Sequence, residues 1–277
     1  MININGKIYL DYGSIPSSII KNLYHNPVFE FHLRWENHKI FFWESHYFKM
    51  MSQLRMLRLN IPMNYTLDFF SNEINKLINN KSKSFIIHLK FLNETKPNYK
   101  NYELELILLI TVEEVPSFRI SDLNVINKIS FFKDYNFTNQ KLGSVSYLQH
   151  DIKRIAAIDA YENNYDDNII LNNQNDIIGS ISGNILLLNK TKIITPPTNI
   201  GAESNVLIDK FVEFIEKINE YKFSYESFGL FELQDSDELC VLSINRGLRP
   251  VVNYKKKIFK IKVFKKLFNL FIDQYYL

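Results

Sequence analysis

The chain has 277 residues, 46% of them hydrophobic, and a formal net charge of +3 at pH 7. This length and composition predict a globular protein of two ordinary domains and exclude a disordered chain. So small a net charge gives no support for a nucleic-acid or membrane partner.

The single cysteine, Cys240, excludes an internal disulfide, and its apolar neighbours predict a buried strand position. No apolar run approaches the roughly 18 residues of a membrane-spanning helix. The N-terminal residues lack a basic segment followed by an apolar core, so we expect no signal peptide and a cytoplasmic protein.

The first half of the sequence predicts an α+β domain over residues 1–116. Apolar residues at helical spacing predict helices that begin at Ser45 and at Thr66. Asn5-Gly6 is typical of a tight hairpin turn, and Leu106–Ile110 is apolar on both faces, as in a central strand. The predicted strands are residues 2–10 (as a hairpin), 29–35, 39–43, 85–92 and 102–112.

The second half, after a linker over residues 117–127, predicts a β-rich domain over residues 128–277. Ala156 and Ala160 give a helix over residues 150–163 a small-residue face that can pack closely on a sheet. Pro196-Pro197 ends the last strand of a meander, because proline cannot donate to a ladder. The predicted strands are 128–132, 168–171, 177–180, 185–188 and 192–195, and further helices are predicted from Val206 and over residues 255–275.

Two further sets of polar residues are candidates for separate sites. The lysines from Lys255 to Lys266 are interpreted as the wet face of the last helix rather than as a binding surface for an anionic partner. The six histidines show no H-x-x-x-H spacing, so no metal site is predicted. His46 is expected to lie at the start of the first helix or beneath it. His150 is expected at a surface position at the start of a helix.

The order of several short motifs carries a resemblance to a known family. These motifs are Val28-Phe29-Glu30 through Arg34, Glu36-Asn37-His38-Lys39, Trp43-Glu44-Ser45-His46, Ala156-x-x-x-Ala160, Tyr165-Asp166, Gly179-x-x-x-Gly183-Asn184-Ile185, Thr195-Pro196-Pro197, Asp237-Glu238-Leu239 and Arg249-Pro250-Val251. Together they resemble the class IV aminotransferases. This fold-type IV group of pyridoxal-phosphate (PLP) enzymes includes branched-chain and D-amino-acid aminotransferases and aminodeoxychorismate lyase.

The resemblance implies an α/β (α+β) fold with an N-terminal α+β sandwich and a barrel-like second domain with flanking helices. It also implies PLP as cofactor, an active site between the domains and a homodimer. In the family a lysine ahead of an N-Y-L segment forms the Schiff base with PLP. Here Ser146-Tyr147-Leu148 stands in place of N-Y-L, which puts the lysine position on Gly143. The glutamate that keeps the pyridine nitrogen protonated falls on Gly179, which has no carboxylate.

The family's phosphate cup also differs in this sequence. Its early arginine corresponds to Lys49, which keeps the charge but loses the bidentate fork. Its later G-[IV]-T-R segment corresponds to Asn205-Val206-Leu207-Ile208, and Glu203 adds a negative charge nearby. The resemblance therefore implies that Val206 and Leu207 occupy degenerate cofactor positions.

We interpret the chain as a degenerate member that has lost Schiff-base chemistry and acts as a binding or scaffolding subunit. One alternative is an active aminotransferase or lyase in which Lys141 or Lys153 has taken over, although solvated surface lysines are the favoured interpretation of both. Another is a protein that binds a small anionic metabolite through Lys49, Arg34 or Arg246, each of which has a plain structural interpretation as well.

Overall fold

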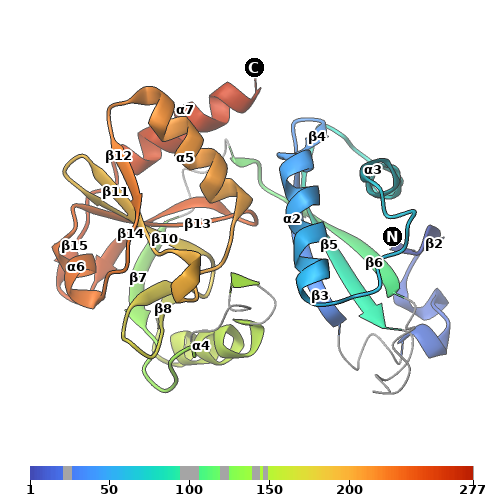
Figure 1. Cartoon of the computed structure of the whole chain (residues 1–277), viewed down its shortest axis with the longest axis horizontal. Helices are drawn as coiled ribbons and strands as arrows, with labels where there is room; N and C mark the ends of the chain where they lie inside the picture. Colours follow the sequence, from blue (N-terminus) through green and yellow to red (C-terminus); the bar gives the residue numbers. More distant parts are fainter. Residues whose placement is uncertain (21–26, 94–105, 119–124, 139–143, 146–148, 277) are drawn as a thin grey trace. The chain divides into compact units, whose positions relative to one another are not determined.

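The computed structural model describes residues 1–20, 27–93, 106–118, 125–138, 144–145 and 149–276. The chain divides into two compact units, residues 1–117 (unit 1) and residues 118–277 (unit 2), as Figure 1 shows by the colour of the chain. None of the helices in the described ranges combines the length and apolar composition that a membrane span requires.

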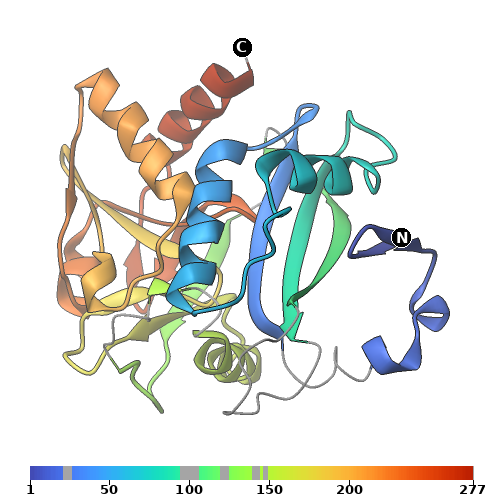
Figure 2. The same ribbon diagram turned by 45° about the vertical axis from the view of Figure 1, so that its right-hand side comes forward.

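Unit 1 is built on an antiparallel sheet of long and short strands, with the strand order β2-β1-β6-β5-β3-β4 in its described part. The strands are β1 (Ile2–Ile4), β2 (Lys7–Tyr9), β3 (Pro27–Glu36), β4 (Lys39–Ile40), β5 (Ser84–Asn93) and β6 (Leu106–Val115). Helices α2 (Trp43–Met56) and α3 (Leu67–Asn75) lie against this sheet (Figure 2). Phe70 of α3 joins the layers, because its ring contacts Trp43 of α2 and Phe91 of β5.

The predicted strand over residues 39–43 is wrong in its second half. Phe42 has a φ of 48°, in the left-handed region, so the chain leaves the sheet after Ile40 and α2 begins at Trp43. The predicted start of α3 is confirmed, because the Thr66 side chain accepts a hydrogen bond from the N–H of Phe69.

A buried ion pair holds the end of β3 in unit 1. The Nε of Arg34 donates to Oε2 of Glu36 at 2.8 Å, and both side chains are 1% exposed. The Arg34 guanidinium also donates to the Pro116 carbonyl. Glu36 accepts hydrogen bonds from the hydroxyls of Ser84 and Ser117. Arg34 therefore connects β3 to the last residues of unit 1, which does not favour the role of a cleft anchor.

His46 lies under α2 and is 3% exposed. Its ring packs against the edge of Phe31, and neither ring nitrogen has a hydrogen-bond partner among the described residues. Burial, with a smaller effect of the Lys49 charge, lowers the pKa of His46 from 6.5 to about 3. The folded unit therefore holds a neutral imidazole, as a buried group without a partner must be.

Unit 2 contains a larger mixed sheet with the order β12-β11-β10-β13-β14-β7-β8-β9, to which β15 adds beside β14. The strands are β7 (Ile126–Phe131), β8 (Asp167–Leu171), β9 (Ile177–Ser180), β10 (Asn184–Asn189), β11 (Lys192–Thr195), β12 (Lys222–Tyr225), β13 (Glu238–Ser243), β14 (Gly247–Tyr254) and β15 (Lys257–Ile258). The helices are α4 (His150–Glu162), α5 (Val206–Ile218), α6 (Leu230–Asp235) and α7 (Val263–Tyr276).

The sheet of unit 2 curls on itself. Strand β9 lies at one edge, and four strands separate it from β10 in the strand order, yet only three residues connect the two. So short a connection requires that the two strands lie close together in space. Alternate residues of the strands point into the curl, where Leu171, Leu187 and Val241 share one core. Ile170 and Ile178 face outward and pack on Ile152 of α4. The four strands predicted over residues 168–195 and the close face of α4 are confirmed, but the predicted meander is wrong at its centre, because β8–β9 and β10–β11 form two hairpins and β9 does not pair with β10.

The predicted C-terminal helix is wrong over residues 255–262. Lys255 has a φ of 52° and turns the chain into the short strand β15, so α7 begins only at Val263. The carboxylate of Glu238 accepts the N–H groups of Lys262, Val263 and Phe264, which fixes this start. Beside it in β13, Cys240 is fully buried as predicted, and burial raises the pKa of its thiol.

Replacing Arg34 with methionine leaves the Glu36 carboxylate buried without its cation. We expect R34M to lower the free energy of unfolding by about 3 kcal/mol or more, measured by urea unfolding. The exposed Arg55 of α2 provides a matched control, and R55M should change stability by no more than about 0.5 kcal/mol. Equal effects of the two substitutions would contradict the role of the ion pair.

His46 makes unit 1 sensitive to acid. Between pH 6.5 and about 3 the unfolded chain binds a proton at this histidine and the folded chain does not, so stability falls as pH falls. Each pH unit in this window removes up to about 1.4 kcal/mol. We expect the urea midpoint of H46L to fall less between pH 7 and pH 5 than that of the unmodified protein, because the variant lacks this histidine. H38N, at an exposed histidine, should leave the pH profile unchanged.

Candidate functional site

The N-terminus of α5 is closed by a side chain of its own segment. Asn205 is the N-cap, and its Oδ1 accepts the N–H of Leu207 at 2.9 Å. The first N–H groups of a helix lack partners within the helix and can bind an anion or a capping side chain. At Leu207, one of the two positions that the resemblance assigns to the cofactor phosphate, the capping side chain has taken the N–H group.

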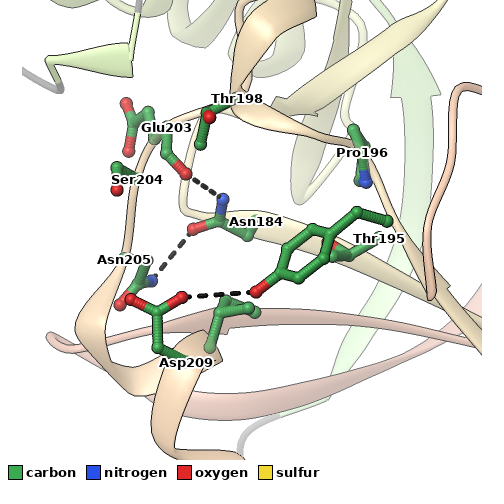
Figure 3. A pocket seen from close by; sticks show the side chains of 10 residues that line it. Asn184, Thr195, Pro196, Thr198, Glu203, Ser204, Asn205 and Asp209 are labelled. Carbon is green, nitrogen blue, oxygen red and sulfur yellow. Dashed lines mark hydrogen bonds between the residues drawn. The ribbon is translucent and has the colours of Figure 1, made fainter. Parts of the chain in front are cut away.

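A short chain of hydrogen bonds fixes this cap to the sheet, as Figure 3 shows. The Asn184 amide of β10 donates to the Glu203 carbonyl at 2.8 Å and accepts from the Asn205 amide at 2.9 Å. The loop before α5 is also held from the other side, because Gln149 donates to the Gly201 carbonyl at 2.6 Å. The loop is therefore connected to β10 and to the segment that begins α4.

A small cavity lies beside the cap. Its volume is about 20 Å³, enough for roughly one water molecule and far too little for a cofactor. At its wall the Tyr225 hydroxyl lies 3.2 Å from Oδ1 of Asp209. Burial and the Asp209 charge raise the pKa of Tyr225, so this hydroxyl stays protonated and can donate to the carboxylate. The remaining lining residues in Figure 3 include Thr195, Pro196, Thr198 and Ser204.

Lys153 of α4 points to the same loop. Its Nζ forms an ion pair with Oε1 of Glu203, and the two side chains are 17% and 15% exposed. Lys153 is therefore not the solvated surface lysine that the helix pattern favoured. The Glu203 carboxylate lies on the loop before a helix end that Asn205 already caps. Lys153 therefore supplies the positive charge beside this carboxylate that helix N–H groups could otherwise provide.

Gly179 lies in β9, paired with Ile170 of β8. A Cβ added there would lie 3.2 Å from the Gly183 carbonyl, so even a small side chain requires some adjustment of the next turn. Gly183 itself is packed still more closely, because its Cβ would lie 2.5 Å from the Leu242 carbonyl of β13. The strand end that the resemblance assigns to the pyridine nitrogen therefore presents backbone only.

The other predicted site residues are spread over the two units. Lys49 is a partly buried residue of α2 in unit 1, and Arg246 is an exposed residue of the turn between β13 and β14 in unit 2. Val206 is the first residue of α5 and is buried. Gly143 and Lys141 lie outside the described residues.

A buried polar cluster next to β9 was not predicted. Asp167 of β8 accepts hydrogen bonds from the hydroxyls of Ser180 and Ser182, and Arg249 of β14 donates to Ser182 at 3.3 Å. Burial raises the pKa of Asp167, although the two hydroxyls and the Arg249 charge act in the opposite direction. These residues are far apart in sequence and match no spacing motif, so only the fold reveals that they meet.

Comparison with known proteins bears on this geometry. A family model described as amino-transferase class IV matches residues 28–254. The chain belongs to the class IV aminotransferases. No curated protein sequence matches it significantly.

Solved structures of this class share the fold. Branched-chain amino acid aminotransferase from Thermobaculum terrenum in its PLP form is 14% identical, with a TM-score of 0.84, over 99% of this chain and 93% of the other. The Escherichia coli branched-chain enzyme is 12% identical, with a TM-score of 0.83, over 98% and 93%. A putative 4-amino-4-deoxychorismate lyase from Legionella pneumophila is 17% identical, with a TM-score of 0.71, over 89% and 90%.

At such low sequence identities the solved structures support the fold alone. Whether PLP fits this class IV aminotransferase therefore depends on the residues of this chain. Several positions of unit 2 that the resemblance assigns to the cofactor carry other residues than the family's. Gly179 supplies no carboxylate for a ring nitrogen, Asn205 occupies the N–H of Leu207, and Glu203 adds a negative charge on the same loop. A phosphate at this helix end has to displace the cap and lie near a carboxylate.

Removing the Asn205 side chain tests the cap. We expect N205A to lower the free energy of unfolding by about 1 kcal/mol or more, because Leu207 loses its acceptor and Asn184 loses a donor. Urea unfolding followed by circular dichroism measures the effect. The exposed Asn199 of the preceding turn is the control, and N199A should stay within about 0.5 kcal/mol of the unmodified protein.

Proposed function

We propose that this class IV aminotransferase has lost Schiff-base chemistry and acts as a binding or scaffolding subunit, in a homodimer as the family resemblance implies. The fold is that of aminotransferases and lyases of this class. The proposal concerns the chemistry, which depends on a few side chains rather than on the fold.

The observation that carries the proposal is the self-capped N-terminus of α5. An anion site at a helix end needs free N–H groups, and the Asn205 side chain uses one of them while its amide is tied to Asn184. Sequence adds that the lysine position falls on Gly143 and the glutamate position on Gly179. These are independent changes in segments that lie far apart in the chain.

The arrangement around Lys153 supports the same proposal. A lysine that attacks an aldehyde must present a neutral amine, which burial away from carboxylates favours. Lys153 instead lies in an ion pair with the Glu203 carboxylate. Lys141 remains the other lysine that could replace the family residue. Binding of a small anionic metabolite is the further alternative, although the burial of Arg34 in an ion pair does not favour it as an anchor.

Adding PLP to the purified protein tests the proposal. We expect no saturable change in the visible absorption spectrum, and no stoichiometric mass increase after borohydride reduction, because Asn205 already takes the N–H of Leu207 and Glu203 adds a negative charge on the same loop. K141A and K153A are measured in parallel. A band of one equivalent that disappears in either variant would instead establish an active PLP site at that lysine.

A one-equivalent adduct that survives in both variants would place the Schiff base elsewhere and also overturn the proposal. The Thermobaculum terrenum enzyme, which has been crystallised in a PLP form, is the positive control for the spectra and for the reduction.

A further inference from the structure

Two histidines that are far apart in sequence face each other across β3 and β5 of unit 1. The antiparallel register puts His32 directly opposite His88, and their rings lie 4.7 Å apart between centroids at an angle of 76°. Glu30 lies two residues before His32, on the same face of β3. The pairing of the two strands therefore brings two imidazoles and one carboxylate together.

The three side chains are close enough to share an ion. Nε2 of His32 is 3.1 Å and Nδ1 of His88 is 3.6 Å from Oε1 of Glu30, and one ligand atom from each residue lies within 4.8 Å of the others. Donor atoms about 2.0 Å from a zinc ion are separated from each other by roughly 3.3 Å in tetrahedral geometry. Small rotations of the side chains bring all three donors to that spacing.

Their burial suits a site that an ion can reach. The exposed fractions are 32% for His32, 23% for His88 and 19% for Glu30, so the donors are partly withdrawn from water but open on one side.

Two neighbouring charges define how the site works. Oε2 of Glu113 lies 3.7 Å from Nε2 of His88, so it is an outer neighbour of that ring. The Nζ of Lys90 lies 3.8 Å from Oε1 of Glu30 and supplies a positive charge where an ion would sit. Lys90 is flexible and half-exposed, so it competes with the ion without closing the site.

We propose that Glu30, His32 and His88 form a binding site for one divalent transition-metal ion, with Zn²⁺ as the preferred ion, on the sheet of unit 1. Two imidazoles and a carboxylate are ligands that suit zinc and its neighbours rather than Mg²⁺ or Ca²⁺. Three protein ligands leave a position for water or for a group from a partner. The ion links β3 to β5 and so stabilises the sheet of unit 1.

The test uses full-length protein without a histidine tag, treated with a chelator and then dialysed. We expect calorimetric titration with ZnCl₂ to show one bound ion per chain, and Co²⁺ to give a visible absorption band. H32A, H88A and E30Q should each weaken Zn²⁺ binding by at least about tenfold. H38N, at an exposed histidine whose φ of 65° suits asparagine, is the matched control and should bind as the unmodified protein does.

A gain-of-affinity variant makes the test independent of folding defects. K90A removes the competing ammonium, so it should bind Zn²⁺ about threefold more tightly. Unmodified protein that binds no zinc, or variants that all bind it equally, would overturn the proposal and leave the three residues as an ordinary hydrogen-bonded cluster. Weaker binding by K90A would also contradict it.

Discussion

A helix N-terminus offers few free N–H groups, and each can serve either its own chain or a ligand. In unit 2 the side chain of Asn205 accepts one of these N–H groups and so caps α5. Its amide also donates to Asn184 of the sheet. Glu203 on the same loop forms an ion pair with Lys153 of α4. Internal contacts thus occupy groups at this helix end that could otherwise meet a negatively charged ligand.

The scaffold around this loop has kept the family's architecture although the identities to solved relatives are as low as 12%. A curled sheet needs only alternating apolar residues that fill its interior, which many sequences supply. Gly183 is an exception, because its approach to the Leu242 carbonyl leaves no room for a side chain. Fold and chemistry thus depend on different residues, and the second can change while the first stays.

Much of the fold could be predicted from the sequence, since local patterns determine it. The strands β8 to β11, the Thr66 cap and the small-residue face of α4 follow from periodicity and turn residues. Phe42 and Lys255 were missed, because left-handed backbone at non-glycine residues has no strong sequence signal. The partners of Asp167, Lys153 and His32 were also missed, because contacts between distant strands and helices depend on a register that no local pattern contains.

The burial of Cys240 has a practical consequence for work on the whole molecule. This thiol is the single cysteine of the chain, is fully buried, and has a raised pKa, so it reacts poorly with maleimides in the folded state. A cysteine introduced on the surface of each unit therefore accepts a fluorophore selectively, without first removing the native residue. Energy transfer between such dyes then reports how the spacing of the two units responds to added molecules.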